Sequence, residues 1–153
     1  MSEMEFEADF NIDEDATEEP LVPDGTYNGS ITNVKFYPEG QNMKFYITLA
    51  DNGGTCTDGE TPVDGATIPL TVWFPREGDK DLQTASGRQS KFQWKVNNIK
   101  KVAKKLGIEM RTPDQIAEAI ANSEWIGLEV SCKISTNEYE GNFSNQVDSA
   151  EAI

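Results

Sequence analysis

Basic and aromatic side chains are interleaved in the stretch from Ser86 to Gly107, SGRQSKFQWKVNNIKKVAKKLG. Ten of the 13 basic residues of the chain lie between Arg76 and Arg111, where only four acidic residues accompany them. Cations bind the phosphates of a nucleic acid, and flat side chains stack on unpaired bases. The stretch therefore has both chemical parts of a surface for single-stranded nucleic acid. The alternative is a solvated lysine-rich helix face with no ligand.

The candidate DNA-binding residues in and beside this stretch are five cations near the start of the helix and one indole. They are Arg76, Lys80, Arg88, Lys91, Trp94 and Lys95. Lys91, Trp94 and Lys95 lie outside the apolar stripe of the helix, so we expect the two lysines to face solvent. The indole is expected either to pack beneath a loop or to stack on a base.

A second set of candidates lies on expected strands. In MKFYITLA (residues 43–50), Lys44 and Tyr46 alternate with apolar residues and face away from them. Trp73 is placed in the same way in the next strand. Tyr46 and Trp73 are the preferred stacking residues, with packing under the long loop of residues 51–65 as the alternative. The remaining DNA-binding candidates are Lys35, Lys133, Tyr139 and Phe143.

Acidic residues are concentrated at the N-terminus of a chain whose net charge is −14. Residues 1–22 contain nine acidic and no basic residues, which predicts a flexible arm. It is either a solvated tail or an anionic segment that competes with nucleic acid or recruits partners. Phe6, Phe10 and Ile12 lie among the acids and could also dock onto the domain.

The composition argues against several classes of protein. The chain has no histidine, which removes histidine-based triads and the common zinc sites. Cys56 and Cys132 are far apart and form no CxxC pattern, so we expect reduced thiols in a cytoplasmic protein. DNGGTCTDGE lacks the terminal ligand of a calcium loop, and no apolar run is long enough for a membrane span. We expect no cofactor, no metal, no catalytic residue and no enzymatic activity.

The order of patterns along the chain predicts three strands, two helices and two strands. The expected strands are residues 26–36, 43–50, 66–75, 124–134 and 143–147, and the expected helices are residues 92–106 and 112–123. This order favours an OB-fold, a mainly β five-stranded Greek-key barrel with a helix between strands three and four. A small α+β sheet and a β-sandwich are the alternatives. The expected domain spans residues 23–148, between the arm of residues 1–22 and a tail of residues 149–153.

Several residues have expected structural roles. Pro69 indicates that the third strand is an edge strand or carries a bulge. Ser86 or Ser90 is expected to cap the long helix, Gly107 to end it, and Thr112 to cap the second helix. Two aromatic residues, Tyr27 and Trp125, are assigned to the core. The apolar stripe of the long helix is expected to comprise Phe92, Val96, Ile99, Val102, Ala103 and Leu106, and the inward residues of the fourth strand Ile126, Leu128, Val130, Cys132 and Ile134.

Four segments together resemble a family of small bacteriophage single-stranded-DNA-binding proteins. They are PLVPDGTYNGSITNVKF, LTVWFP, FQWKVNNIKKVAKKLGI and WIGLEVSCKISTNEYEGNFSNQV, within residues 18–148. The resemblance implies an OB-like barrel that coats single strands in replication, recombination or repair in the host cytoplasm. This sequence differs from that family in one respect: its acidic segment is N-terminal, whereas such proteins usually carry an acidic tail at the C-terminus.

The sequence thus predicts a single-stranded-DNA-binding protein without base preference. Its expected partners are single-stranded DNA and, through the acidic arm, replication or recombination proteins; a homodimer is one open option. The alternative function is a non-enzymatic virion structural or scaffold protein that uses the barrel for protein contacts. A third option, an acidic DNA mimic, fits the net charge but not the basic span.

Overall fold

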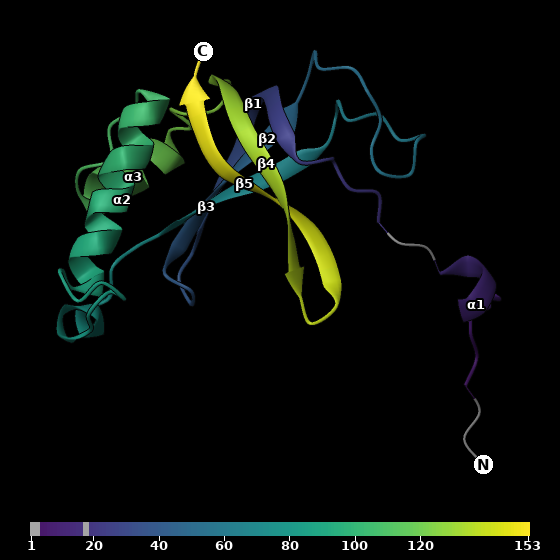
Figure 1. Ribbon diagram of the computed structural model, residues 1–153, viewed down its shortest axis with the longest axis horizontal. Coiled ribbons are helices and arrows are strands. Elements are labelled where there is room, and N and C mark those ends of the chain that lie inside the picture. Colours follow the sequence, from purple (N-terminus) through teal and green to yellow (C-terminus); the bar gives the residue numbers. More distant parts are fainter. Residues whose placement is uncertain (1–3, 17–18) are drawn as a thin grey trace.

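The computed structural model describes residues 4–16 and 19–153 and is mainly β (Figure 1). Its elements in chain order are α1 (Ile12–Asp15), β1 (Gly25–Tyr37), β2 (Asn42–Leu49), β3 (Thr67–Trp73), the 3₁₀ helix η1 (Glu77–Asp81), α2 (Lys91–Leu106), α3 (Pro113–Ala121), β4 (Glu129–Tyr139) and β5 (Asn142–Ala152). The predicted order of strands and longer helices is confirmed, whereas α1 and η1 were not predicted.

The five strands form one antiparallel sheet in the order β3-β2-β1-β4-β5. β1 is shared by both halves of the sheet, because its first part pairs with β4 and its second part with β2. Gly29 lies where the two pairings overlap, and a Cβ there would come within 2.7 Å of the Thr48 carbonyl oxygen. Glycine therefore permits the close approach of β2 at the point where β1 changes partner.

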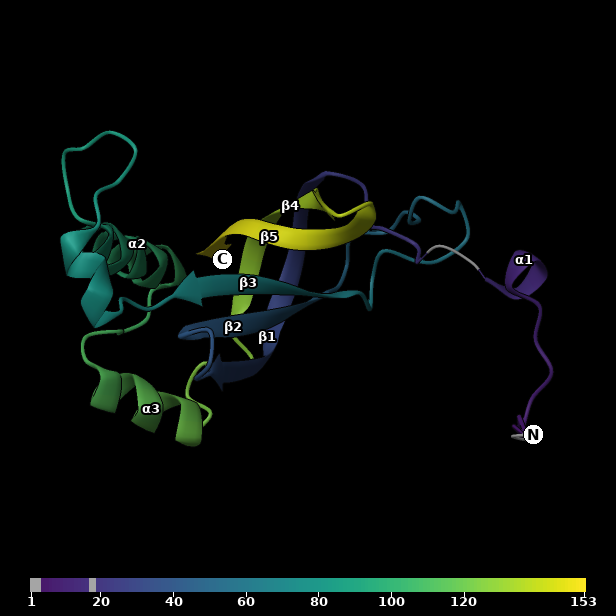
Figure 2. The same ribbon diagram turned by 90° about the horizontal axis from the view of Figure 1, so that it is seen from below.

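The sheet curls so that its two edge strands, β3 and β5, contact each other, as Figure 2 shows. Pro69 lies in β3, so the prediction of an edge strand is confirmed. Since an edge strand has one side free of ladder bonds, a residue without an N–H is tolerated there.

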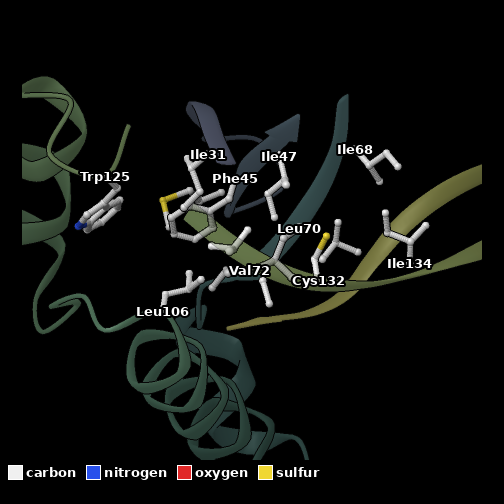
Figure 3. Close-up of a cluster of buried hydrophobic side chains, with 14 of the residues drawn as sticks. Ile31, Phe45, Ile47, Ile68, Leu70, Val72, Leu106, Trp125, Cys132 and Ile134 are labelled. Atoms are coloured by element: carbon white, nitrogen blue, oxygen red, sulfur yellow. The ribbon is translucent and has the colours of Figure 1, made fainter. Parts of the chain in front are cut away.

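The core fills the inner side of this curled sheet (Figure 3). The predicted alternation is confirmed in β2 and β3, whose inward residues are all buried: Met43, Phe45, Ile47, Leu49, Ile68, Leu70 and Val72. Trp125 is buried as predicted, with its ring centroid 5.6 Å from that of Phe45. Tyr27 is only half-buried, and its hydroxyl donates to the Pro23 carbonyl at 2.7 Å.

The predicted helix ends are also confirmed. Ser90, rather than Ser86, caps α2 by accepting from the Gln93 N–H, and Gly107 follows the helix with a φ of 67°. Thr112 caps α3, and Pro113 is its first residue. These caps fix the start of α2 beside η1 and the turn between the two helices.

The C-terminal strand and the domain ends differ from the expectation. β5 continues to Ala152, through most of the predicted tail. The sequence did not predict this length because only Val147 and Ala150 of the strand are buried, so its apolar signal is short. At the other end, Val22 is buried and its N–H donates to Asn145 Oδ1 at 2.8 Å. The predicted arm also includes residues 1–3 and 17–18, which lie outside the described residues.

Two residues placed on apolar faces are exposed. Ile126 belongs to a turn before β4 and is 43% exposed, so its assignment to the inward side of a strand was wrong. Val96 is 38% exposed, because the sheet covers only part of the apolar stripe of α2. No helix within residues 4–16 and 19–153 has the length and apolar character to cross a membrane.

Candidate nucleic-acid interface

The outer side of β1, β2 and β3 carries no carboxylate in a strongly acidic protein. These three strands contain no acidic residue, although the chain has 27. Away from the core, the end of this sheet near the β1–β2 turn presents what we name the aromatic–lysine face: Lys35, Tyr37, Lys44, Tyr46, Thr71 and Trp73. A surface without carboxylates, in so acidic a protein, is suited to an anionic ligand.

The register of the strands brings three aromatic rings together on the aromatic–lysine face. Tyr37 lies opposite Asn42, which lies opposite Trp73. The hydroxyls of Tyr37 and Tyr46 are hydrogen-bonded, and this bond, together with burial, raises the pKa of Tyr46 above its ordinary value. Trp73 is 47% exposed. The face therefore keeps an open indole beside two phenol rings, which is what base stacking requires.

The two lysines of the face are direct neighbours. Lys35 and Lys44 are opposite each other in the β1–β2 ladder, and the Lys44 Nζ lies 5.6 Å from the centroid of the Tyr37 ring. Neither lysine makes an ion pair within the part of the chain that the structure describes. Like charges directly across a ladder repel each other, so a phosphate placed between them would relieve that repulsion.

Tyr37 is the residue that sequence reasoning missed. A bulge between Ile31 and Asn33 shifts the alternation of β1 by one position. As a result Val34 points toward the core, and Lys35 and Tyr37 point outward. The available signal was Lys35 itself, since an unpaired lysine belongs on the solvent side and Tyr37, two residues later, shares its side.

Three of the predicted DNA-binding cations make contacts within the fold. Arg76 Nη2 donates to the Glu39 carbonyl at 2.6 Å and so links the end of β3 to the β1–β2 turn. Lys80 pairs with Glu77 at 2.9 Å, with its Nζ 5.1 Å from the Phe92 ring centroid. Lys95 pairs with Asp79 at 2.8 Å and is half-buried, so the expectation that it faces solvent was wrong.

The other cations near the start of α2 form a separate surface. Trp94 is 48% exposed, and with Lys91, Lys95 and the preceding loop it lines a cavity of about 540 Å³. Arg88 is exposed in that loop. The basic span of the sequence is therefore not one surface: Arg88, Lys91 and Trp94 form a patch of their own at the start of α2.

The last three candidates lie on the other half of the sheet. Lys133 is opposite Thr26 in β4, nine positions along β1 from Lys35, so it is not part of the aromatic–lysine face. Tyr139 and Phe143 flank the β4–β5 hairpin turn and are both exposed. In Figure 1 this hairpin and the β1–β2 turn project in the same direction.

The Asp79–Lys95 pair gives a testable pH dependence of stability. Asp79 is buried, and its Oδ2 accepts from Lys95 Nζ and from the Arg76 N–H, which together lower the pKa of the carboxyl below its ordinary value of 3.8. A lowered pKa stabilises the fold above that value, and the stabilisation is lost as the pH falls through the folded-state pKa.

We therefore expect Asp79→Asn to lower the melting temperature at pH 7 and to have a smaller effect in acid. Thermal melts from pH 7 to pH 2 measure this, with the exposed neighbour Asp81→Asn as control. An equal deficit at every pH would contradict it.

The described residues contain no group of three or more Cys, Asp or Glu side chains that could hold a metal ion. Both cysteines are buried, and burial raises the pKa of the Cys132 thiol to about 11. Chemically, then, the surface is suited to binding through rings and lysines.

In comparisons with known proteins, no family model and no curated protein matches the chain.

Proposed function

We propose that the protein binds single-stranded DNA without base preference and is not an enzyme. The observation that carries the proposal is the aromatic–lysine face, where Tyr37, Tyr46 and Trp73 lie beside Lys35 and Lys44 on strands free of acidic residues. The resemblance to phage single-stranded-DNA-binding proteins supports a role in replication, recombination or repair of a bacteriophage.

We further propose that the sheet is an OB-fold barrel. β1 pairs with both β2 and β4, α2 lies between β3 and β4 in the chain, and β3 approaches β5. All three features agree with the Greek-key order of that fold. OB-folds bind oligonucleotides on the face of strands two and three, which here carries Lys44, Tyr46 and Trp73.

In this mechanism the bases stack on the rings, and the phosphates follow the lysines. A stacked base contributes about 1–3 kcal/mol, and every base has a flat face, so the interaction tolerates any sequence. A duplex keeps its bases paired and stacked, so it has no free ring surface to offer Trp73 and Tyr46. The patch of Arg88, Lys91 and Trp94 is a second contact for a longer strand.

Tryptophan fluorescence tests the proposal. We expect oligo(dT) to quench the emission strongly at low salt and duplex DNA to quench it weakly, because only unpaired bases reach the exposed indoles. The variant Trp73→Phe keeps a ring but loses the signal, so it should bind with similar affinity and show much less quenching. Trp94→Phe is the matched control for the second patch. No binding of oligo(dT) by any variant or by the wild type would contradict the proposal and favour a scaffold role.

A further inference from the structure

An apolar groove lies between α2 and α3 and remains open in the structure. It has a volume of about 1,100 Å³, and residues at or just after the ends of β1 and β3 contribute to its lining. Its apolar lining includes Phe36, Phe74, Phe92, Val96, Ile99 and Ile120. Phe36 is 45% exposed and Val96 is 38% exposed. Apolar side chains left open together in this way mark a site for a partner.

The N-terminal arm carries an apolar cluster of matching character. Phe6 and Phe10 pack edge to face with their centroids 6.0 Å apart, and they are 66% and 59% exposed. Ile12, in α1, is also exposed. In Figures 1 and 2 this part of the chain projects away from the sheet. The two rings are thus already together but uncovered.

One wall of the groove, α2, carries the charge opposite to that of the arm, whereas the lining toward α3 is mixed, with Glu109 and Asp114 beside Arg111. α2, one wall of the groove, contains six lysines and no acidic residue. Lys100 lines the groove itself, and Lys104 lies one turn further along the same helix. The described part of the arm, residues 4–16, contains six acidic residues and no basic residue. An arm whose rings enter the groove would therefore place its carboxylates beside the lysines of α2.

The arm with α1 lies at one end of the molecule, and the helices α2 and α3, which line the groove, lie at the other end in both Figure 1 and Figure 2. The chain is fixed at Val22, beside the start of β1, whereas Phe36 brings the far end of β1 to the groove. Twelve residues separate Val22 from Phe10 and span at most about 40 Å. The 11 residue steps of β1 from Gly25 to Phe36 cover about 36 Å. An arm that reached its own groove would therefore have to be almost fully extended, without α1.

We propose that the arm of one copy, through Phe6 and Phe10, docks into the α2–α3 groove of a second copy. The contact is head to tail, since the arm and the groove are different surfaces, so each copy can accept one neighbour and donate to another. Repetition of the contact produces an open chain of copies. This inference does not depend on DNA binding and is tested in its absence.

Sedimentation velocity of the full chain tests the contact. We expect the average mass to rise with protein concentration at low salt and to return toward the monomer at high salt, because salt screens the carboxylate–lysine attraction. The double variant Phe6→Ala/Phe10→Ala and the groove variant Val96→Asp should each remain monomeric. The control Tyr139→Ala/Phe143→Ala removes two exposed rings from the hairpin and should associate like the wild type.

Mixing the two defective variants makes the test decisive. The arm variant still has a groove, and the groove variant still has an arm, so the mixture should form one-to-one heterodimers and nothing larger. A cooperative thermal melt of Val96→Asp alone shows that this variant is folded. A wild type that stays monomeric at every concentration, an arm variant that still associates, or a mixture that stays monomeric would each overturn the proposal.

Discussion

Replacing both Tyr46 and Trp73 by alanine is expected to weaken oligo(dT) binding by about 30-fold to 10⁴-fold. The estimate follows from two stacked bases at about 1–3 kcal/mol each, with tenfold in affinity for every 1.4 kcal/mol. Trp73 is 47% exposed, and Tyr46 is half-buried on the outer side of β2, so neither ring supports the core. The fold should therefore survive, and fluorescence anisotropy of a labelled oligo(dT) measures the loss.

Two control variants separate stacking from structure. Tyr46→Phe removes the hydroxyl that bonds to Tyr37 but keeps the ring, so affinity should change little. Tyr139→Ala/Phe143→Ala removes two exposed rings from the hairpin and should cost much less than the double variant on the face. Equal losses for the two double variants would mean that the strand does not follow the aromatic–lysine face.

Local sequence patterns predicted the strands and helices of this fold because each pattern depends on residues that are close together in the chain. In β2, strict alternation placed Phe45 and Ile47 in the core and Tyr46 outside it, as the structure shows. At the start of α2 the Ser90 side chain accepts a hydrogen bond from a backbone N–H, and at its end Gly107 adopts a left-handed conformation. Both features depend on neighbouring positions alone. Tyr46 and Trp73 could be selected as candidates for the same reason.

The rest of the candidate site depends on pairing between distant segments. A bulge in β1 decides that Tyr37 faces outward, and nothing in GSITNVKFY specifies where that bulge falls, although Lys35 indicates which side faces solvent. Asp79 and Lys95 are 16 residues apart, and only the packing of η1 against α2 turns that lysine from a candidate ligand into half of a buried ion pair. Charge summed along the sequence could not show that the basic span and the lysines of the sheet form separate surfaces.

The separation of these surfaces changes how the charge of the protein is understood. The net charge of −14 arises largely from the arm, whereas β1, β2 and β3 hold no carboxylate. An approaching polyanion is repelled by the molecule at a distance but meets Lys35 and Lys44 at the sheet. Because salt screens the long-range repulsion and weakens the local attraction, the two effects act in opposite directions. The change in salt dependence when particular lysines are removed therefore reports whether those lysines contact phosphate.

Replacing Lys35 and Lys44 by glutamine is expected to reduce the salt dependence of oligo(dT) binding. For single strands, the slope of log affinity against log salt is about −0.7 per phosphate contact, so losing two contacts should make it shallower by about 1.4. Affinity should then fall by about 25-fold more at low salt than at tenfold higher salt.

The matched control Lys101→Gln/Lys104→Gln makes the same change in net charge on exposed positions of α2. Anisotropy titrations at several salt concentrations give both slopes. Equal changes in the two variants would show that net charge, and not the paired lysines of β1 and β2, attracts the strand.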